Sequence, residues 1–411
     1  MNLLILSFFY LAIFLSLFIR GEKKIFLGAI LLPSLLPFFF KPVFIFFYGT
    51  PVLYSNFFSL EAATKGMLFE TLWLLIIVAM VSVKVVRREK VVAKRINKID
   101  EKSLAMYLVA LALSATLLFG LLGSSFLAVN RSTSLAVMAP WTRYVYPFIL
   151  FGQIVAIAYF AKSRVLKMGG LSTWLPIAAL LFGFILINQR GIILSGIIYY
   201  FSILLITKRI TYLKLLFGLP FLFALAAYAK VMNTFLQGGN ILEDLFFILE
   251  GPDGVSLQIW SILYSYVEVN GYSHGTSLLS GLVGIIPASY RVELGLLNIT
   301  DHLNLFYHAD GYLNSGFGFN GSFTQDAFLS FGWFGLLLAF PIGYVVNRLL
   351  ETSLSYLKSE RFTELFLVLW FTSIFLVGGF QVLHWFLIPL SFLVLGKLKL
   401  GSSPSRIKSG S

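Results

Sequence analysis

The residues of this chain that could do chemistry are cations, carboxylates, histidines and aromatic rings, because cysteine is absent from all 411 positions. Without cysteine there are no disulfides, no thiol catalysis and no zinc–thiolate sites. Neither Asp-x-Asp nor His-x-x-x-His spacing occurs, so no sequence pattern gathers a divalent ion. A phosphate-binding GxxxxGKS/T loop is missing as well. We therefore expect a site that uses no metal and no other cofactor.

One stretch, residues 231–325, combines tyrosine and tryptophan with side-chain amides and carboxylates. Aromatic faces stack on the C–H faces of sugars, and amide and carboxylate groups pair with sugar hydroxyls. This composition favours carbohydrate as the ligand. The residues expected to contact sugar are Trp260, Tyr264, Tyr272, Tyr312 and Gln325.

Four cations are candidates for binding a phosphate or pyrophosphate group: Arg190 first, then Arg291, Lys230 and Arg143. Arginine suits this role because its planar fork matches two phosphate oxygens. Arg190 and Lys230 each lie at the end of an apolar run, where a cation is costly unless it serves a function. Cations beside a sugar-binding surface indicate a lipid-linked sugar as the ligand.

The composition of the chain indicates a membrane protein. Hydrophobic residues make up 58% and charged residues 12%, whereas soluble domains average about 45–50% and about 25%. This difference excludes a conventional soluble enzyme. The net charge of +13 would favour nucleic acid as the partner of a soluble protein, but cytoplasmic loops of membrane proteins are enriched in lysine and arginine. We expect membrane lipid as a partner and no nucleic acid.

Long apolar runs predict an all-α polytopic integral membrane protein with about 11 transmembrane helices. Residues 1–230 hold the first eight, residues 231–325 form a long external loop, residues 326–396 hold the last three, and residues 397–411 form a basic cytoplasmic tail. The expected spans are 2–19, 25–47, 66–86, 103–123, 144–161, 172–188, 191–206, 215–230, 326–346, 364–380 and 382–396.

The distribution of lysine and arginine sets the expected orientation. When the basic segment 87–102 is placed in the cytoplasm, most of the 31 basic residues fall on that side, with the N-terminus outside and the C-terminus inside. We interpret Lys65 and Arg131 as solvated loop charges. The basic residues left on the outer side are Lys41, Lys65, Arg131, Arg143, Arg190, Lys230 and Arg291.

The external loop is rich in aromatic and apolar residues, which argues against disorder. Residues 255–269 carry apolar side chains on one helical face, which predicts an amphipathic helix on the outer membrane surface. Residues 276–289 are apolar but too short to span, so we expect an interfacial or re-entrant segment. The glycine-rich residues 311–321 permit close approach of the backbone to a ligand.

Two stretches of the chain resemble a known family. They are GYSHGTSLLSGLVGIIPASYR at 271–291 and GSFTQDAFLSFGWFG at 321–335, together with Gln189-Arg190-Gly191 at the end of a predicted helix. These stretches, and the plan of many spans with one long outer loop late in the chain, are similar to bacterial oligosaccharide repeat-unit polymerases, the Wzy type of O-antigen and capsule assembly. The resemblance covers most of residues 180–345.

The resemblance implies a GT-C-like glycosyltransferase of the bacterial inner membrane, with its site facing the periplasm. The reaction is a metal-independent, inverting transfer of a growing glycan from undecaprenyl pyrophosphate to a hydroxyl of a second undecaprenyl-pyrophosphate-linked repeat unit. A chain-length-regulating co-polymerase is the protein partner that the family implies. The attacking hydroxyl needs a carboxylate or imidazole within hydrogen-bond reach. The candidates for this base are Asp326, His308 and Glu268.

Two other functions remain open from the sequence. An O-antigen ligase uses the same donor, but its family carries a histidine just before a late helix, where residues 323–326 here read Phe-Thr-Gln-Asp. A flippase or transporter for lipid-linked oligosaccharide usually shows paired repeats and polar residues near the middle of several helices. Here the charges lie near the outer ends of the spans and no repeat is evident, so the sequence favours the polymerase.

The topology can be tested by cysteine labelling, because the native chain contains no cysteine. A single cysteine at Asn240, in the external loop, should react with a membrane-impermeant maleimide added to the outside of intact cells. A cysteine placed within residues 87–102 should react only after the membrane is permeabilised. Labelling of position 240 from the cytoplasmic side alone would reverse the predicted orientation.

Overall fold

The part of the chain that the computed structural model describes is built of helices and contains no strand, which confirms the predicted helical class. It comprises residues 2–19, 21–49, 58–83, 142–165, 190–211, 256–283, 286, 288–315 and 321–378. The α-helices are α1 (Leu3–Ile19), α2 (Glu22–Leu31), α3 (Lys41–Tyr48), α4 (Leu60–Ser82), α8 (Thr142–Val165), α10 (Arg190–Ile206), α13 (Ser256–Asn270), α14 (Thr276–Gly281), α15 (Ala288–Glu293), α16 (Ile299–Ser315), α17 (Phe323–Phe331), α18 (Ala339–Lys358) and α19 (Phe362–Gly378). The tighter or wider helical turns are η1 (Leu32–Ser34), η2 (Leu36–Phe40) and η4 (Gly332–Leu338).

Two helical segments within the described residues are long and apolar enough to cross a membrane. They are α4 and the run Phe323–Lys358, which joins α17, η4 and α18. The pair Glu22–Ser34 and Leu36–Phe47, bent by 59°, passes the same test if it is counted as one span. The predicted spans that lie outside the described residues are 103–123, 172–188, 215–230 and 382–396.

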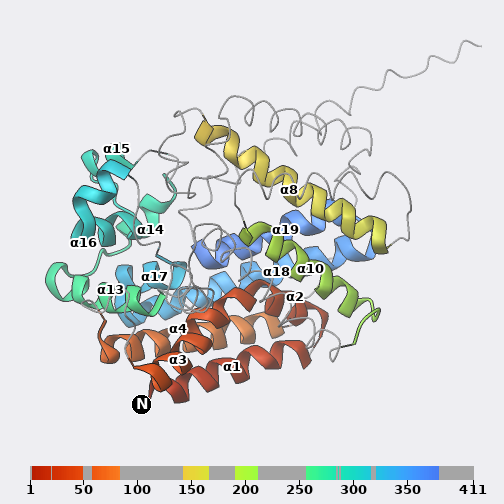
Figure 1. Cartoon of the computed structure of the whole chain (residues 1–411), viewed down its shortest axis with the longest axis horizontal. Coiled ribbons are helices and arrows are strands. Elements are labelled where there is room, and N and C mark those ends of the chain that lie inside the picture. Colours follow the sequence, from red (N-terminus) through yellow and green to blue (C-terminus); the bar gives the residue numbers. More distant parts are fainter. Residues whose placement is uncertain are drawn as a thin grey trace, which may run out of the picture.

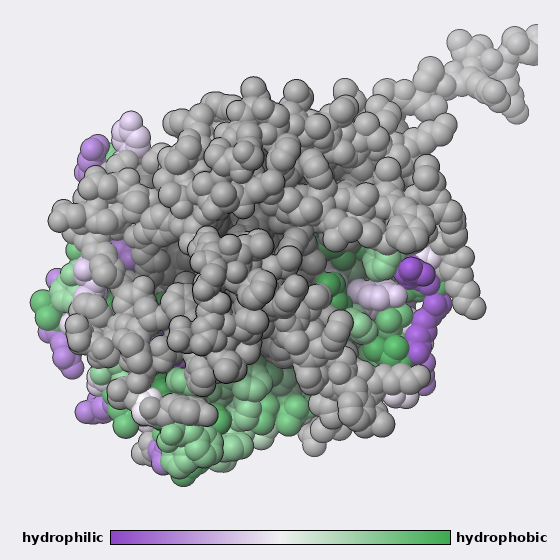
Figure 2. Space-filling view, in the orientation of Figure 1, coloured by the Kyte–Doolittle hydropathy of each residue, from purple (hydrophilic) through white to green (hydrophobic). Residues whose placement is uncertain are grey.

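The helices pack side by side around an apolar core, with α4 in contact with α1, α13 and α18, and α18 also against α19. Figure 1 shows α1 to α4 together along one side of the bundle, and α13 to α16 gathered at one end. In Figure 2, hydrophobic residues follow the lower edge of the molecule, and hydrophilic residues lie toward its left and right ends. Large apolar side chains such as Phe9, Phe47 and Phe334 are exposed, a surface that suits contact with lipid.

The span predicted at 326–346 lies within the run Phe323–Lys358, in which the helical geometry changes from α17 through η4 to α18. Gly332 ends α17 with a φ of 59°, a left-handed conformation that glycine adopts without strain. A Cβ on Gly335 would lie 2.4 Å from the carbonyl oxygen of Ala327, so the chain approaches α17 this closely because residue 335 has no side chain. The two glycines therefore allow the change of helical geometry that hydropathy alone does not indicate.

The helix predicted at 255–269 forms, as α13, but its first half is buried rather than laid on a surface. Every residue from Leu257 to Leu263 is buried, polar ones included. The reason is contact with α4: Ser261 Oγ accepts the N–H of Ser59 at 3.1 Å, just before α4 begins. A helical segment that is covered on all sides belongs to the interior of a bundle, and residues 257–263 meet this description whereas the last turn of α13 is exposed.

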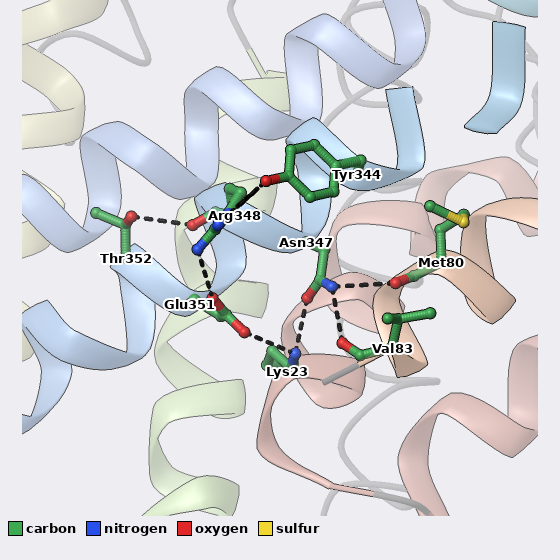
Figure 3. Close-up of polar contacts among 8 residues, drawn as sticks. All are labelled: Lys23, Met80, Val83, Tyr344, Asn347, Arg348, Glu351 and Thr352. Carbon is green, nitrogen blue, oxygen red and sulfur yellow. Dashed lines mark hydrogen bonds and ion pairs between the residues drawn. The ribbon is translucent and has the colours of Figure 1, made fainter. Parts of the chain in front are cut away.

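One end of the bundle is held by a polar network that joins α2, α4 and α18 (Figure 3). The side-chain nitrogen of Asn347 donates to the carbonyl oxygens of Met80 and Val83, each at 3.0 Å, where α4 ends. The side-chain oxygen of Asn347 accepts a bond of 2.7 Å from Lys23 Nζ, which also pairs with Glu351 at 3.1 Å. These contacts supply a side-chain donor to carbonyl groups at the end of a helix, where intrahelical donors run out. They bring together the start of α2, the end of α4 and the middle of α18.

Replacing Asn347 by leucine should destabilise this end of the bundle, because two carbonyl groups and Lys23 each lose a partner. Lys23 keeps Glu351 and the Met80 carbonyl oxygen keeps the N–H of Val83, so what is lost is three hydrogen bonds. Each contributes about 0.5–1.5 kcal/mol, and we expect the free energy of unfolding to fall by about 1–3 kcal/mol. Thermal unfolding of the purified protein in detergent measures the loss. The control is Thr352→Val on the same helix, which should change stability by less than about 0.5 kcal/mol. Equal melting temperatures for the two variants would contradict this role of Asn347.

Candidate functional site

The first turn of α17 is the place where polar residues of α4, α13, α14 and α17 meet. Ser322 caps this turn: its hydroxyl accepts the N–H of Gln325 at 3.3 Å, and the side-chain oxygen of Gln325 accepts the N–H of Ser322 at 2.8 Å. The sequence Ser-Phe-Thr-Gln encodes this capping box. The side-chain nitrogen of Gln325 donates to the carbonyl oxygen of Ser256 at 3.1 Å, at the start of α13. Gln325 is therefore held on both sides.

Glu70 attaches that turn to α4. Its buried carboxylate accepts hydrogen bonds from Thr324 Oγ1 at 2.5 Å and from the indole nitrogen of Trp260 at 3.3 Å. One turn earlier on α4, a Cβ on Gly66 would lie 2.3 Å from Trp260 Cγ, so the absence of a side chain makes room for the indole. Sequence reasoning had not singled out Glu70, although an ionisable residue in the middle of an apolar helix is a signal of function.

Asp326 lies in the same turn and faces the stretch at 271–283. Ser277 Oγ donates to its carboxylate at 2.5 Å, and the two residues are 0% and 3% exposed. A second contact fixes the alignment of the two segments: the N–H of Ser273 donates to the carbonyl oxygen of Leu329 at 2.9 Å. The two stretches that carry the family resemblance are thus folded against each other.

Aromatic rings surround Phe328 on the next turn of α17. The ring centroids of Tyr264, Trp260, Phe69 and Tyr272 lie 4.8, 5.3, 5.5 and 6.1 Å from its own. Offset and edge-on contacts at these distances are favourable beyond the area that they bury. The cluster therefore fixes the positions of Tyr264 and Tyr272 relative to α17.

The predicted sugar-binding residues differ in exposure. Tyr272 is 41% exposed and Tyr264 is half-buried, so both keep surface for a ligand. Trp260 and Gln325 are buried by the contacts described above and offer none in this structure. Tyr312 lies in α16, and its side chain is outside the described residues.

Of the two candidate bases whose side chains the structure describes, Asp326 lies at this junction. Glu268 is exposed on the last turn of α13, and within the described residues no hydrogen bond or ion pair joins it to α17. His308 belongs to α16, with its side chain outside the described residues. Another histidine of α16, His302, lies with its Nδ1 2.8 Å from the hydroxyl of Tyr266, and burial lowers its pKa.

Arg291, which we expected to bind pyrophosphate, is engaged by the protein itself. Its guanidinium donates to both carboxylate oxygens of Asp301, at 2.9 and 2.7 Å, and also to a backbone carbonyl oxygen. Both side chains are buried, and the pair ties α15 to α16. Charge had suggested a ligand, whereas the structure gives this arginine an internal partner. The other candidate cations, Arg190 at the start of α10, Arg143 in α8 and Lys230, have side chains outside the described residues.

Comparisons of the chain with known protein families, with curated proteins and with solved structures found no match. Within the described residues, no group of three or more His, Asp or Glu comes together as a metal site. The chemistry of the junction follows from Asp326, whose carboxylate already accepts a hydroxyl hydrogen bond from Ser277. An alcohol that took the place of that hydroxyl would lie within reach for proton transfer to the carboxylate.

Replacing Arg291 by methionine should reduce stability, because it leaves Asp301 buried without its cation. Breaking one partner of a buried ion pair costs about 3–5 kcal/mol, which unfolding in detergent measures. The double variant Arg291→Met with Asp301→Asn should recover most of that loss, since no buried charge remains and an oxygen at position 301 still accepts the N–H of Asn298. If Arg291→Met alone keeps the melting temperature of the native protein, the pair has no structural role and a ligand-binding role for Arg291 is restored.

Proposed function

We propose that the chain is a polymerase of lipid-linked oligosaccharide repeat units, a multi-pass glycosyltransferase of the bacterial inner membrane that assembles O-antigen or capsular polysaccharide at the outer face. The supporting observation is the contact of the 271–283 stretch with α17, because these are the stretches that resemble the family and they meet at Asp326. The proposal includes eleven spans, with the N-terminus outside and the C-terminus in the cytoplasm.

The proposed reaction uses Asp326 as the base. The acceptor hydroxyl displaces Ser277, and the carboxylate takes its proton as the hydroxyl oxygen bonds to the anomeric carbon of the donor. The bond from that carbon to the pyrophosphate oxygen breaks, and undecaprenyl pyrophosphate leaves with the electron pair, so attack from the opposite face inverts the anomeric centre. Positive charge stabilises the leaving group without protonating it. Arg190 remains the first candidate for that charge, since Arg291 is engaged elsewhere.

A flippase or transporter for the same lipid-linked glycan is the second candidate. The observation that favours it is Glu70, a buried carboxylate near the middle of α4. Ionisable residues at such depth are typical of helices that line transport pathways. Translocation moves the lipid without joining two glycans, so the products distinguish the two functions.

The test is polymer formation by the purified protein in nanodiscs, supplied with lipid-linked repeat units and excess EDTA. We expect a ladder of products for the native chain. Asp326→Asn keeps an oxygen to accept the Ser277 hydroxyl but cannot act as a base, and it should lower the rate by about 10²–10⁴-fold. The control is Glu293→Gln, which makes the same charge change on the exposed face of α15.

Three results would change the proposal. A ladder lost in EDTA and restored by Mg²⁺ or Mn²⁺ would overturn the metal-free mechanism. A near-normal rate for Asp326→Asn would move the base to His308 or Glu268. Transbilayer movement of the lipid in vesicles, with no ladder under any condition, would replace the polymerase by a flippase.

A further inference from the structure

Lys65 lies in the second turn of α4, at the end away from the Asn347 network. Its side chain is 51% exposed, and its ammonium group is 2.6 Å from the carboxylate of Glu61. The same nitrogen lies 5.9 Å from the centre of the Tyr264 ring, within the range of a cation–π contact. Lys65 is therefore not the freely solvated loop charge that the sequence suggested, because α4 and α13 together hold it on an aromatic face.

The hydroxyl of Tyr264 is buried and has no hydrogen-bond partner within the described part of the chain. Burial raises the pKa of Tyr264, and the nearby hydroxyl of Tyr272 raises it further, so the group remains a neutral donor. Buried hydroxyls in proteins are nearly always bonded, and leaving one without a partner is costly. A ligand that supplies an acceptor oxygen would satisfy this donor, and it requires the Tyr264 side chain to move, because the hydroxyl has no exposed surface in this structure.

Lys65, Tyr264 and Tyr272 could each contact a different part of a phosphorylated sugar. An ammonium group is a compact positive charge for phosphate oxygens, a phenol donates to a phosphate or sugar oxygen, and the partly exposed ring of Tyr272 presents a face to sugar C–H groups. We infer that Lys65, Tyr264 and Tyr272 form a docking point for the phosphate-bearing end of a phosphorylated carbohydrate. This inference rests on the proposed function, because it assigns the point to the lipid-linked sugar substrate.

Glu61 acts as the counter-ion of the empty docking point. It lies one turn before Lys65 and is largely exposed, and exposed ion pairs contribute little to stability. An incoming phosphate therefore displaces the carboxylate from Lys65 at small cost. The two members of the pair then have opposite effects on binding, since Lys65 attracts the anion and Glu61 repels it.

The docking point lies next to the proposed base. Tyr264 contacts Phe328, which follows Asp326 by two residues on α17. Tyr272 also contacts Phe328 and begins the stretch that supplies Ser277 to Asp326. A sugar whose phosphate is bound at Lys65 is thereby directed toward the first turn of α17, beside α13 and α14 in Figure 1.

The test measures binding of farnesyl pyrophosphate to the full chain in neutral nanodiscs, without turnover. We expect Lys65→Ala to raise the Kd at least about tenfold, Tyr264→Phe to raise it by a smaller factor, and Glu61→Gln to lower it about two- to threefold. The matched control is Lys208→Ala, which removes an exposed lysine in the turn after α10 and should leave the Kd unchanged. Thermal melting of each variant shows that it is folded.

Opposite shifts for Lys65→Ala and Glu61→Gln support the docking point, because a purely structural ion pair would move both variants in the same direction. Inorganic pyrophosphate and phosphatidylglycerol serve as competitors that separate a pyrophosphate site from a phospholipid headgroup site. Equal competition by phosphatidylglycerol, or an unchanged Kd for Lys65→Ala, would overturn the inference. A product ladder that forms at the native rate in Lys65→Ala would overturn the docking point and leave the polymerase proposal intact. If the Kd values shift as expected but no variant and no native protein forms a ladder, the docking point is supported and the polymerase proposal fails.

Discussion

The carboxylate of Glu70 lies in the apolar interior of the bundle. The arrangement of α4, α13 and α17 depends on the hydrogen bonds that this carboxylate accepts. An unpaired carboxylate in such surroundings is costly. Its donors, Trp260 and Thr324, are 190 and 254 residues away in the chain. One buried group thus joins three segments that are remote in sequence. It fixes the first turn of α17, which contains Asp326, to α4.

Local features of the chain were predictable to the extent that they depend on neighbours in sequence. The apolar length of α4 and the Ser-x-x-Gln start of α17 can both be recognised in the sequence, because helix length and capping depend on neighbouring residues. The change from α17 to the tighter turn η4 at Gly332 was not predicted, because hydropathy averages across it. The burial of the first half of α13 was missed because periodicity reports the side chains of one helix and not what covers them.

In the candidate site, the residue types could be predicted from the sequence but their partners could not. Asp326, Tyr264 and Tyr272 could be chosen by chemistry, and the structure places all three around α17. The bond from Ser277 to Asp326 spans 49 residues, and no spacing rule supplies such a pair. The ion pair of Arg291 was not predicted, because its partner Asp301 lies ten residues later, beyond a turn between two helices, where the i, i+4 rule does not apply.

The close fit between Gly66 and Trp260 has a consequence for how this chain can change during evolution. A methyl group at position 66 would overlap the indole, so alanine at that position requires a smaller side chain at 260. Losing the indole in turn removes one of the two donors to the carboxylate at 70. Positions 66, 70 and 260 are therefore expected to vary together among related chains. A substitution at one of the three positions alone disturbs the packing or the hydrogen bonding of the other two.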